Sequence, residues 1–394
     1  MEICPQNICT GCQACRMSCK HSAIQMVENE KGNIYPIINE EKCTGCQRCI
    51  NTCPALHPIS TNNQKQPRVF AGWTKNGKQR KRSTSGGLSF VISKHIVKNK
   101  GIFCGVIWTE QGAEHQICED ISMLNKFQGS KYAHSDVRNT YIEIQNLLKT
   151  GKKVLFTGTP CQVAGLKNFL RKEYDNLYTV DLVCHGVPSR LFLRQTIKNI
   201  EKKYNSKVID IRFKEKTPDQ YHTSMNYYLE NGKVDSERYS KSFFFRSFVD
   251  NYILRENCFH CQYSSLQRIS DITLADFWNY TPYNLKFRSY RKGTSLILLN
   301  TDKGEELFSE IKNELIYEER SIQEALKSNQ NLKKPQEKPQ LYEEFWKDYF
   351  NGVEQNTLHK RYLTSPKEQD WTIVVKGYIK MILPIKMIKL LKHL

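Results

Sequence analysis

The cysteines near the N-terminus are the residues whose types and spacing most directly predict chemistry. Eight of the fifteen cysteines lie in the first 53 residues, in two runs with the same spacing. The first run is Cys9, Cys12, Cys15 and Cys19, and the second is Cys43, Cys46, Cys49 and Cys53. Three thiolates in a short loop suit a 4Fe–4S cubane, whereas tetrahedral zinc prefers two separated pairs. The runs predict two 4Fe–4S clusters, with zinc or disulfide bonds as the alternatives.

The tandem repeat of this spacing resembles that of bacterial-type ferredoxins. In those proteins the fourth cysteine of each run ligates the other cluster. By this logic one cluster is held by Cys9, Cys12, Cys15 and Cys53, and the other by Cys43, Cys46, Cys49 and Cys19. One departure is that Lys20, not proline, follows Cys19. We expect residues 1–57 to form a two-cluster ferredoxin-like domain that moves electrons.

Four further cysteines form a second candidate metal site. Cys161 and Cys184 each lie at the end of an expected strand, beside the N-terminus of an expected helix, which stabilises negative charge. Cys258 and Cys261 form one close pair. Together the four predict a third cluster site. The alternative is that Cys161 and Cys184 are buried thiols and that the pair is a surface redox or zinc pair.

The elements around Cys161 and Cys184 alternate between strand and helix. The order is a strand at 153–157, a turn, a helix at 162–173, a strand at 177–184, a turn and a helix at 190–204. This order predicts a parallel βαβ unit. Both turns then lie at the carboxyl ends of neighbouring strands, where α/β sheets place their ligands.

Hydrophobic periodicity predicts further elements on both sides of this unit. We expect helices at 88–98, 141–150, 243–256 and 303–319, and strands at 101–108, 208–214, 225–231, 269–277 and 294–300. Residues 58–83 are polar and turn-rich, which predicts a linker, and residues 328–340 predict a connector. The fold class is therefore a ferredoxin-like domain followed by a larger mixed α/β domain at 84–327.

Composition limits the partners and the compartment. The 394 residues carry a formal charge of +19, which favours anionic substrates or acidic lipids. No nucleic-acid-binding module is present, so we expect no nucleic-acid partner. The N-terminus has neither a basic nor an apolar signal region, and fifteen cysteines without export are more often ligands or thiols than disulfides. We expect a reducing, cytoplasmic location.

The C-terminal segment combines apolar residues with regularly spaced lysines. Residues 371–394 are rich in Ile, Leu, Met and Val, and Lys376, Lys380, Lys386, Lys389 and Lys392 are three to six residues apart. Such a basic amphipathic segment is typical of peripheral contact with an anionic membrane. The alternative is a terminal helix that packs on the domain or on another subunit. We expect residues 328–394 to be a connector and this tail.

A flavin is the cofactor that we expect beside the clusters. Iron–sulfur clusters move single electrons, and a flavin couples them to two-electron chemistry. The chain has neither the dinucleotide-binding glycine motif nor a phosphate-binding P-loop. Ser85-Gly86-Gly87 and Gly158-Thr159 instead offer backbone N–H groups at helix starts, which can hold a pyrophosphate.

The order of the motifs resembles the coenzyme F420 hydrogenase/dehydrogenase beta-subunit family. The motifs are 83–87, Gly129-Ser130-Lys131-Tyr132, 158–162, 184–189, Cys258-x2-Cys261, 270–273 with 276–278, and 293–295. The resemblance covers roughly residues 1–320 and implies FAD and a third 4Fe–4S cluster on Cys161, Cys184, Cys258 and Cys261. It also places Ser85, Gly86, Gly87, Lys131, Gly158, Thr159 and Asp276 near the flavin. Ala275 stands where the family commonly has glycine, which puts the role of Asp276 in doubt.

Lys131 and His185 are the candidate catalytic residues beside a flavin. A lysine there can stabilise the anionic reduced form, and a neutral histidine can relay a proton. The alternatives are a surface charge for Lys131 and a turn residue bonded to backbone for His185.

The expected function is an oxidoreductase that passes electrons between the clusters and FAD for hydride exchange with a soluble, anionic small molecule. The resemblance implies a deazaflavin coenzyme or, as in relatives associated with surface-polysaccharide synthesis, a sugar-linked intermediate. A redox partner protein or a small electron donor would supply the electrons. The alternative is a non-catalytic electron-transfer subunit of a larger complex.

Overall fold

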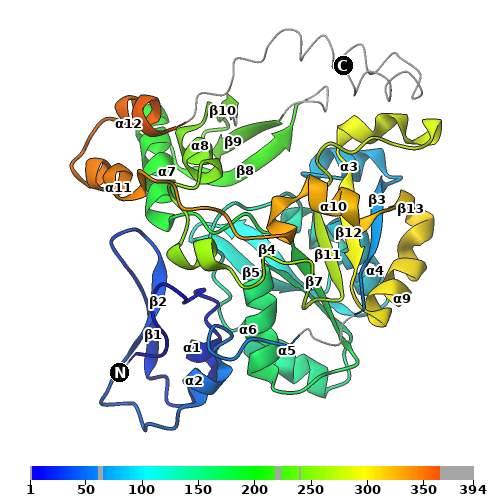
Figure 1. Ribbon diagram of the computed structural model, residues 1–394, viewed down its shortest axis with the longest axis horizontal. Coiled ribbons are helices and arrows are strands. Elements are labelled where there is room, and N and C mark those ends of the chain that lie inside the picture. Colours follow the sequence, from blue (N-terminus) through cyan, green and yellow to red (C-terminus); the bar gives the residue numbers. More distant parts are fainter. Residues whose placement is uncertain (1, 61–64, 218–222, 239–240, 364–394) are drawn as a thin grey trace.

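A computed structural model describes residues 2–60, 65–217, 223–238 and 241–363 (Figure 1). The two cysteine runs fold in the same way. Gly11 and Gly45 have φ of 68° and 69°, and Gln13 and Gln47, the residues before two short helices, have φ of 64° and 58°. The helices are α1 (Ala14–Ser18) and α2 (Arg48–Thr52), and an antiparallel hairpin of β1 (Ile24–Glu28) and β2 (Ile34–Ile38) lies between them in the chain. These residues form the ferredoxin-like domain that the spacing predicted.

An eight-stranded mixed sheet forms the centre of the larger domain. Its order is β13-β3-β12-β11-β7-β6-β4-β5. The strands are β3 (Arg68–Thr74), β4 (Ile102–Thr109), β5 (Gly112–Cys118), β6 (Val154–Gly158), β7 (Leu177–Leu182), β11 (Ile272–Asp276), β12 (Ser295–Leu299) and β13 (Leu315–Arg320). Strands β4, β6, β7 and β11 are parallel, and antiparallel strands lie on either side of them. The expected parallel βαβ unit is confirmed as β6, α6 (Pro160–Leu170) and β7.

Successive residues of a strand point to opposite faces, so each face of the sheet receives its own helices. Leu155 of β6 packs with α4 (Leu88–Lys98) and α9 (Asp302–Ile311). Its neighbours Val154 and Phe156 pack with α5 (Thr140–Lys149), α6 and α1 of the ferredoxin domain. The ferredoxin domain therefore shares a core with the sheet face that α5 and α6 cover.

A second core lies beside a smaller sheet of β8 (Val208–Lys216), β9 (Thr223–Leu229) and β10 (Val234–Arg238). Four helices contribute to it: α7 (Arg190–Tyr204), α8 (Phe243–Val249), α11 (Tyr342–Phe350) and α12 (Gln355–Tyr362). The remaining helices are α3 (Gly77–Arg82) and α10 (Ile322–Ser328), with short 3-10 segments at 121–127, 256–260, 285–292, 312–314 and 330–332. The expected strands at 208–214 and 225–231 correspond to β8 and β9.

Four expected elements differ from the structure. Residues 58–83 do not form a linker throughout, because β3 pairs with both β12 and β13 inside the sheet and α3 follows it. The helix expected at 303–319 ends at Ile311, and its second half is strand β13. Residues 342–362 of the expected connector and tail are helices α11 and α12, since Phe345 and Trp346 are buried in the second core. The helix expected at 243–256 ends at Val249.

Within the described residues, none of the helices has the length and apolar character that crossing a bilayer requires. The basic segment 371–394, with its five lysines, lies outside the described residues.

Candidate metal centre and cofactor site

The structure gathers the first predicted ligand set into one buried group. We call Cys9, Cys12, Cys15 and Cys53 the inner thiol group; all four are buried. Burial raises the pKa of Cys15 well above its usual value, and the nearby thiols of Cys12, Cys9 and Cys53 raise it further. Cys53 comes from the second run and lies with three cysteines of the first run, so this grouping is compatible with the predicted exchange of fourth cysteines, which stays a prediction.

The second predicted ligand set lies at the surface. We call Cys19, Cys43, Cys46 and Cys49 the outer thiol group. These four residues line one recess, together with Ala23, Ile24, Ile38 and the loop 42–48. Cys46 is exposed, and hydrogen bonds, the largest from the backbone of Arg48, lower its pKa.

Cys4 also lies against the inner thiol group, which its isolated position in the sequence gave no reason to expect. A hydrogen bond with Cys4 is the largest cause that lowers the pKa of Cys9 to about 6 and of Cys53 to about 7. The pKa of Cys4 itself is raised, first by its hydrogen bonds with Cys53 and Cys9. Cys4 has one S–H proton to share with its two neighbours, and a thiol that donates to a thiolate stabilises the deprotonated, metal-binding form of that neighbour.

Cys161, Cys184, Cys258 and Cys261, here the third thiol group, converge from three parts of the larger domain. Burial raises the pKa of Cys184 to about 12, and the nearby Cys258 and Cys261 raise it further. Burial likewise raises the pKa of Cys161, with Cys184 and Cys261 as neighbouring thiols. A cluster's positive irons would reverse this penalty, because metal binding deprotonates thiols.

The inner and third thiol groups are neighbours. Cys12 and Cys261 are both among the charges that act on Cys161 and on Tyr263. Tyr141 lies between the groups and donates its hydroxyl to the Cys12 and Gln162 carbonyls, at 3.3 and 2.9 Å. A Cβ at Gly165 of α6 would lie 3.0 Å from Cys12 Sγ. Helix α6 therefore carries both Cys161 and the surface that receives Cys12.

In the part of the chain that the structure describes, no three His, Cys, Asp or Glu side chains are close enough to hold a single metal ion. A cubane distributes four thiolates over four irons, so its ligands are farther apart than those of one ion. The donor sets fit the predicted clusters in residue type and in grouping.

The motifs predicted to hold the flavin lie at the carboxyl edge of the large sheet. Ser85 donates to the Thr294 carbonyl at 2.9 Å, and the Gly86 N–H donates to Ser295 Oγ at 3.0 Å. A Cβ at Gly86 would lie 2.4 Å from the Gly72 carbonyl oxygen, so this close packing needs glycine. The loop 83–87 is thereby fixed against β3 and the start of β12.

Strand β8 brings a row of cations to the same edge. Arg212, Lys214 and Lys216 alternate with residues that enter the second core, such as Phe213. Lys214 pairs with Asp276 at 2.8 Å, and Lys216 donates to the Ser85 carbonyl at 2.6 Å. Burial lowers the pKa of Lys216 to about 7.

Lys131 lies in the loop beside this row of cations. Its ammonium donates to the backbone carbonyls of Lys126 and Gln128, and Arg212 donates to the same Gln128 carbonyl at 3.2 Å. Burial and the charge of Arg212 lower the pKa of Lys131 to about 7. The neighbouring Tyr132 is close enough for Lys214, Asp276 and Cys184 to act on its pKa, which burial raises. We call the part of the sheet edge that carries Arg212, Lys214, Lys216 and Lys131 the cationic edge. It is adjacent to the third thiol group.

Gly158, Thr159 and His185 lie beside the third thiol group and make contacts within the chain. Thr159 is the N-cap of α6: its N–H donates to Gln162 Oε1 at 3.0 Å, and its hydroxyl lies 3.2 Å from Cys161 Sγ. His185 Nε2 is 3.2 Å from the Phe248 carbonyl, and Nδ1 is 3.2 Å from Gln336 Nε2. Burial lowers the pKa of His185. These contacts hold a neutral imidazole in place, and its proposed role as a proton relay stays a prediction.

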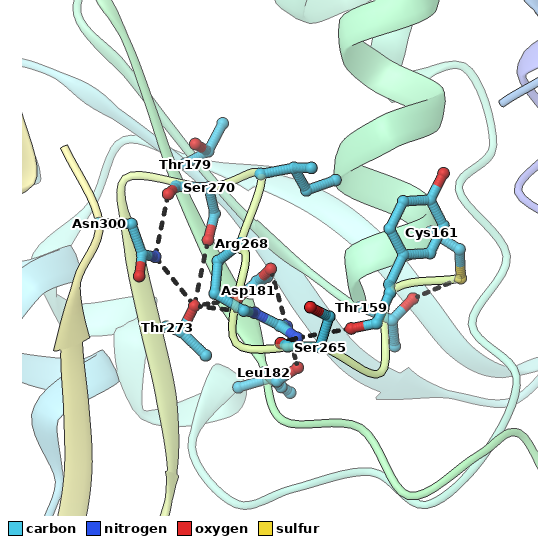
Figure 2. Close-up of polar contacts among 12 residues, drawn as sticks. Thr159, Cys161, Thr179, Asp181, Leu182, Ser265, Arg268, Ser270, Thr273 and Asn300 are labelled. Carbon is cyan, nitrogen blue, oxygen red and sulfur yellow. Dashed lines mark hydrogen bonds and ion pairs between the residues drawn. The ribbon is translucent and has the colours of Figure 1, made fainter. Parts of the chain in front are cut away.

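A buried ion-pair network supports the third thiol group, and no spacing signal in the sequence pointed to it. Arg268 pairs with Asp181 of β7 at 2.9 Å, and Thr273 donates to the same carboxylate at 2.6 Å (Figure 2). Arg268 also donates to the Tyr263 carbonyl at 2.7 Å and to the Leu182 carbonyl at 3.1 Å. It therefore joins the loop after Cys261 to the strand that precedes Cys184.

Family models match both the ferredoxin-like domain and the larger domain. Residues 151–325 match the family described as the C terminus of the coenzyme F420 hydrogenase/dehydrogenase beta subunit. Residues 8–56 and 35–87 match two families of 4Fe–4S dicluster domains. No curated protein matches the chain. Among solved structures, it is similar to one from the F420-reducing NiFe hydrogenase complex of Methanosarcina barkeri, with 15% identity and a TM-score of 0.44 over 76% of this chain and 95% of that chain.

The fold and its donor groups define an iron–sulfur redox protein of mixed α/β architecture. One part of the chain matches 4Fe–4S dicluster domains and another matches the C terminus of the coenzyme F420 hydrogenase/dehydrogenase beta subunit, the family that the order of its motifs resembles.

Proposed function

We propose that this protein is a flavin- and iron–sulfur-dependent oxidoreductase with three 4Fe–4S clusters and one FAD. The adjacency of the inner and third thiol groups through Cys12 and Cys161 carries the proposal. The outer thiol group is exposed through Cys46, the inner group is buried, and the third group lies by the cationic edge. This order supports entry of electrons from a partner protein or small donor at the outer group and their use at the edge of the sheet.

The bound cofactors would supply one-electron transfer at the thiol groups and hydride exchange at the cationic edge. The residues of that edge fit an anionic cofactor. Lys214 already pairs with Asp276, and Lys216, with its pKa of about 7, can take up a proton and favour negative charge. The tight turn at Gly293, with φ of 102°, brings its backbone against Lys216 and Ser85. Lys131, with its pKa near neutrality, can hold or release a proton at Nζ. A soluble anionic substrate, either a deazaflavin coenzyme or a sugar-linked intermediate, would reach this same edge.

The second candidate function is a non-catalytic electron-transfer subunit. The observation that favours it is the family description, which names a beta subunit. In this case the substrate site would belong to a partner, and the outer thiol group would be one of two protein contacts. Turnover of a small substrate by the purified chain would favour the enzyme, and obligate co-purification with a larger protein would favour the subunit.

Anaerobic metal and flavin analysis tests the proposal. We expect about twelve irons and one FAD per chain, since each cubane holds four irons. Cys258→Ser should lose about four irons and stop transfer between the ferredoxin domain and the flavin, with flavin retained. Cys118→Ser, at a buried thiol outside the three groups, is the matched control. Eight irons in the wild-type chain would refute the third cluster, and absence of flavin would refute the proposed oxidoreductase.

A further inference from the structure

Arg255 is the most deeply buried cation between the two domains. Its side chain is fully buried, although arginine is rarely buried without a partner. Its backbone lies at the third thiol group: the Arg255 N–H donates to the Val187 carbonyl at 2.9 Å, and the Cys258 N–H donates to the Arg255 carbonyl at 2.9 Å. The Val187 N–H in turn lies 3.4 Å from Cys258 Sγ.

The side chain of Arg255 extends from there into the ferredoxin domain. Its Nε donates to the Cys9 carbonyl at 2.7 Å, and its guanidinium lies 4.2 Å from the centre of the Tyr35 ring. A Cβ at Gly11 would lie 3.1 Å from Nη1, so the loop of the first cysteine run closes directly over the guanidinium. Arg255 therefore reaches from Cys258 of the third thiol group to Cys9 of the inner group.

The guanidinium still has hydrogen-bonding capacity. Nη1 and Nη2 are buried and make no geometrically good hydrogen bond to a described residue, and the Cys9 thiol, whose pKa the charge of Arg255 helps to lower, is their neighbour. An uncompensated buried charge costs several kcal/mol, so an anion is expected beside it. His134, the neighbouring ring, does not add a second cation, because burial, helped by the charge of Arg255, lowers its pKa to about 3.

The anions that fit this position are the thiolate-ligated clusters on either side. A 4Fe–4S cluster with four thiolates is negatively charged, and hydrogen bonds and charges around its sulfurs set its reduction potential. Reduction adds one more negative charge, so a cation nearby stabilises the reduced form and raises the potential. Arg255 is among the charges that act on Cys9 and Cys258, but it is not among those that act on Cys46 and Cys49 of the outer thiol group.

We propose that Arg255 is a positioning residue shared by the inner and third clusters, which compensates the charge of both and raises both reduction potentials. This inference rests on the proposed third cluster. It assigns no substrate contact to Arg255. The outer cluster, held away from Arg255, serves as an internal reference.

Redox titration of the full-length, anaerobically purified protein, followed by electron paramagnetic resonance, tests the proposal. In Arg255→Gln we expect the reduced fraction at a given potential to fall about tenfold for two clusters, which is about 59 mV for a one-electron couple. The outer cluster should keep its wild-type potential. Arg255→Lys keeps the charge and should lie between wild type and Arg255→Gln. Lys338→Gln is the matched control. It removes a surface cation that pairs with Glu256, the residue that follows Arg255 in the chain.

Several results would overturn the proposal. The first is unchanged reduction potentials in Arg255→Gln protein that contains all of its clusters. The second is an equal shift in the potentials of all three clusters, and the third is the same shift in Lys338→Gln. If Arg255→Gln loses iron, the iron content of Arg255→Lys distinguishes two explanations. Iron retained in Arg255→Lys shows that the clusters need the positive charge, and equal loss of iron in both variants shows that Arg255 has a purely structural role. Eight irons in the wild-type chain would instead refute the third cluster. The change in the reduction potential of the inner cluster in Arg255→Gln would then still test whether Arg255 stabilises the reduced form of that cluster.

Discussion

At the scale of single residues, Arg268 shows how a buried ion pair holds a ligand loop. The side chains of Arg268 and Asp181 are 2% and 0% exposed, and the arginine also binds the Tyr263 and Leu182 carbonyls. A buried pair adds little net stability, but loss of one partner leaves a charge without compensation. The consequence of removing Arg268 should therefore appear both in stability and at the third thiol group.

We predict that Arg268→Met lowers the unfolding free energy by about 3–5 kcal/mol and reduces iron by about four atoms per chain. Thermal unfolding and iron analysis measure the two effects. The double variant Asp181→Leu with Arg268→Met should recover part of the stability, because no charge remains buried. Arg361→Met removes an arginine from an exposed pair with Asp348 and should change stability by less than about 1 kcal/mol. Normal iron in Arg268→Met would contradict the anchoring role.

Lys131 should make stability depend on pH. Its pKa falls from 10.5 to about 7 on folding, so between these values the unfolded chain binds more protons than the folded chain. The unfolding free energy should then rise with pH from about 7 to 10, by at most about 1.4 kcal/mol per unit. Lys131→Met removes this slope, and its stability relative to wild type should fall as the pH rises. Unfolding midpoints at pH 7, 8 and 9, with the exposed Lys126→Met as control, measure the difference; parallel profiles would contradict it.

The residues that could be predicted from the sequence are those whose spacing is set by a local loop. Two runs of cysteines specify their own local geometry, so the amino-acid sequence alone was enough to predict the dicluster domain, and the assignment of its ligand sets stays a prediction. Arg255, Arg268 and Cys4 each interact with a residue more than forty positions away in the chain. No local sequence pattern predicts these interactions. Their functional meaning depends on the packing of the two domains.

At the scale of elements, strong periodicity gave accurate bounds and weak periodicity did not. Helices α4 and α7 occupy the expected residues 88–98 and 190–204. Strand β3 was missed because its neighbours in the chain are polar and its partners, β12 and β13, lie more than 200 residues away. Strand β13 was merged into the preceding helix, since its apolar residues continue the pattern of α9 without a glycine or proline between them.

Helix α11 offers the test of whether residues after 340 belong to the fold. Trp346 is 2% exposed and packs against Phe192 of α7, whereas Phe350 on the same helix is 47% exposed. We predict that Trp346→Ala lowers the unfolding free energy by about 3–5 kcal/mol, because the second core loses a large buried ring. Phe350→Ala should cost much less. Thermal unfolding of both variants checks this, and equal small losses would show that α11 contributes little to the core.

At the scale of the whole molecule, the ferredoxin domain and the larger domain form one structure. The Gln262 side chain donates to the Pro54 carbonyl at 2.7 Å, and Asn168 donates to the His57 carbonyl at 2.7 Å. Together with Arg255, these bonds fix the distance between the inner and third thiol groups. A rigid junction suits electron transfer, which falls steeply when donor and acceptor separate. The two domains thus act as one unit, although the sequence pattern predicted that a linker separates them.

The whole-molecule charge of +19 also bears on where the protein works. The amphipathic segment 371–394 carries lysines at regular intervals, and each lysine near an anionic bilayer contributes about 1 kcal/mol. We predict that the full chain sediments with anionic vesicles and that deletion of residues 370–394 abolishes this, with flavin content and turnover unchanged. Binding should weaken steeply as salt rises, because the attraction is screened over about 10 Å at 0.1 M salt. Neutral vesicles are the control. Loss of flavin or insolubility of the shortened chain would show instead that the segment packs on the protein.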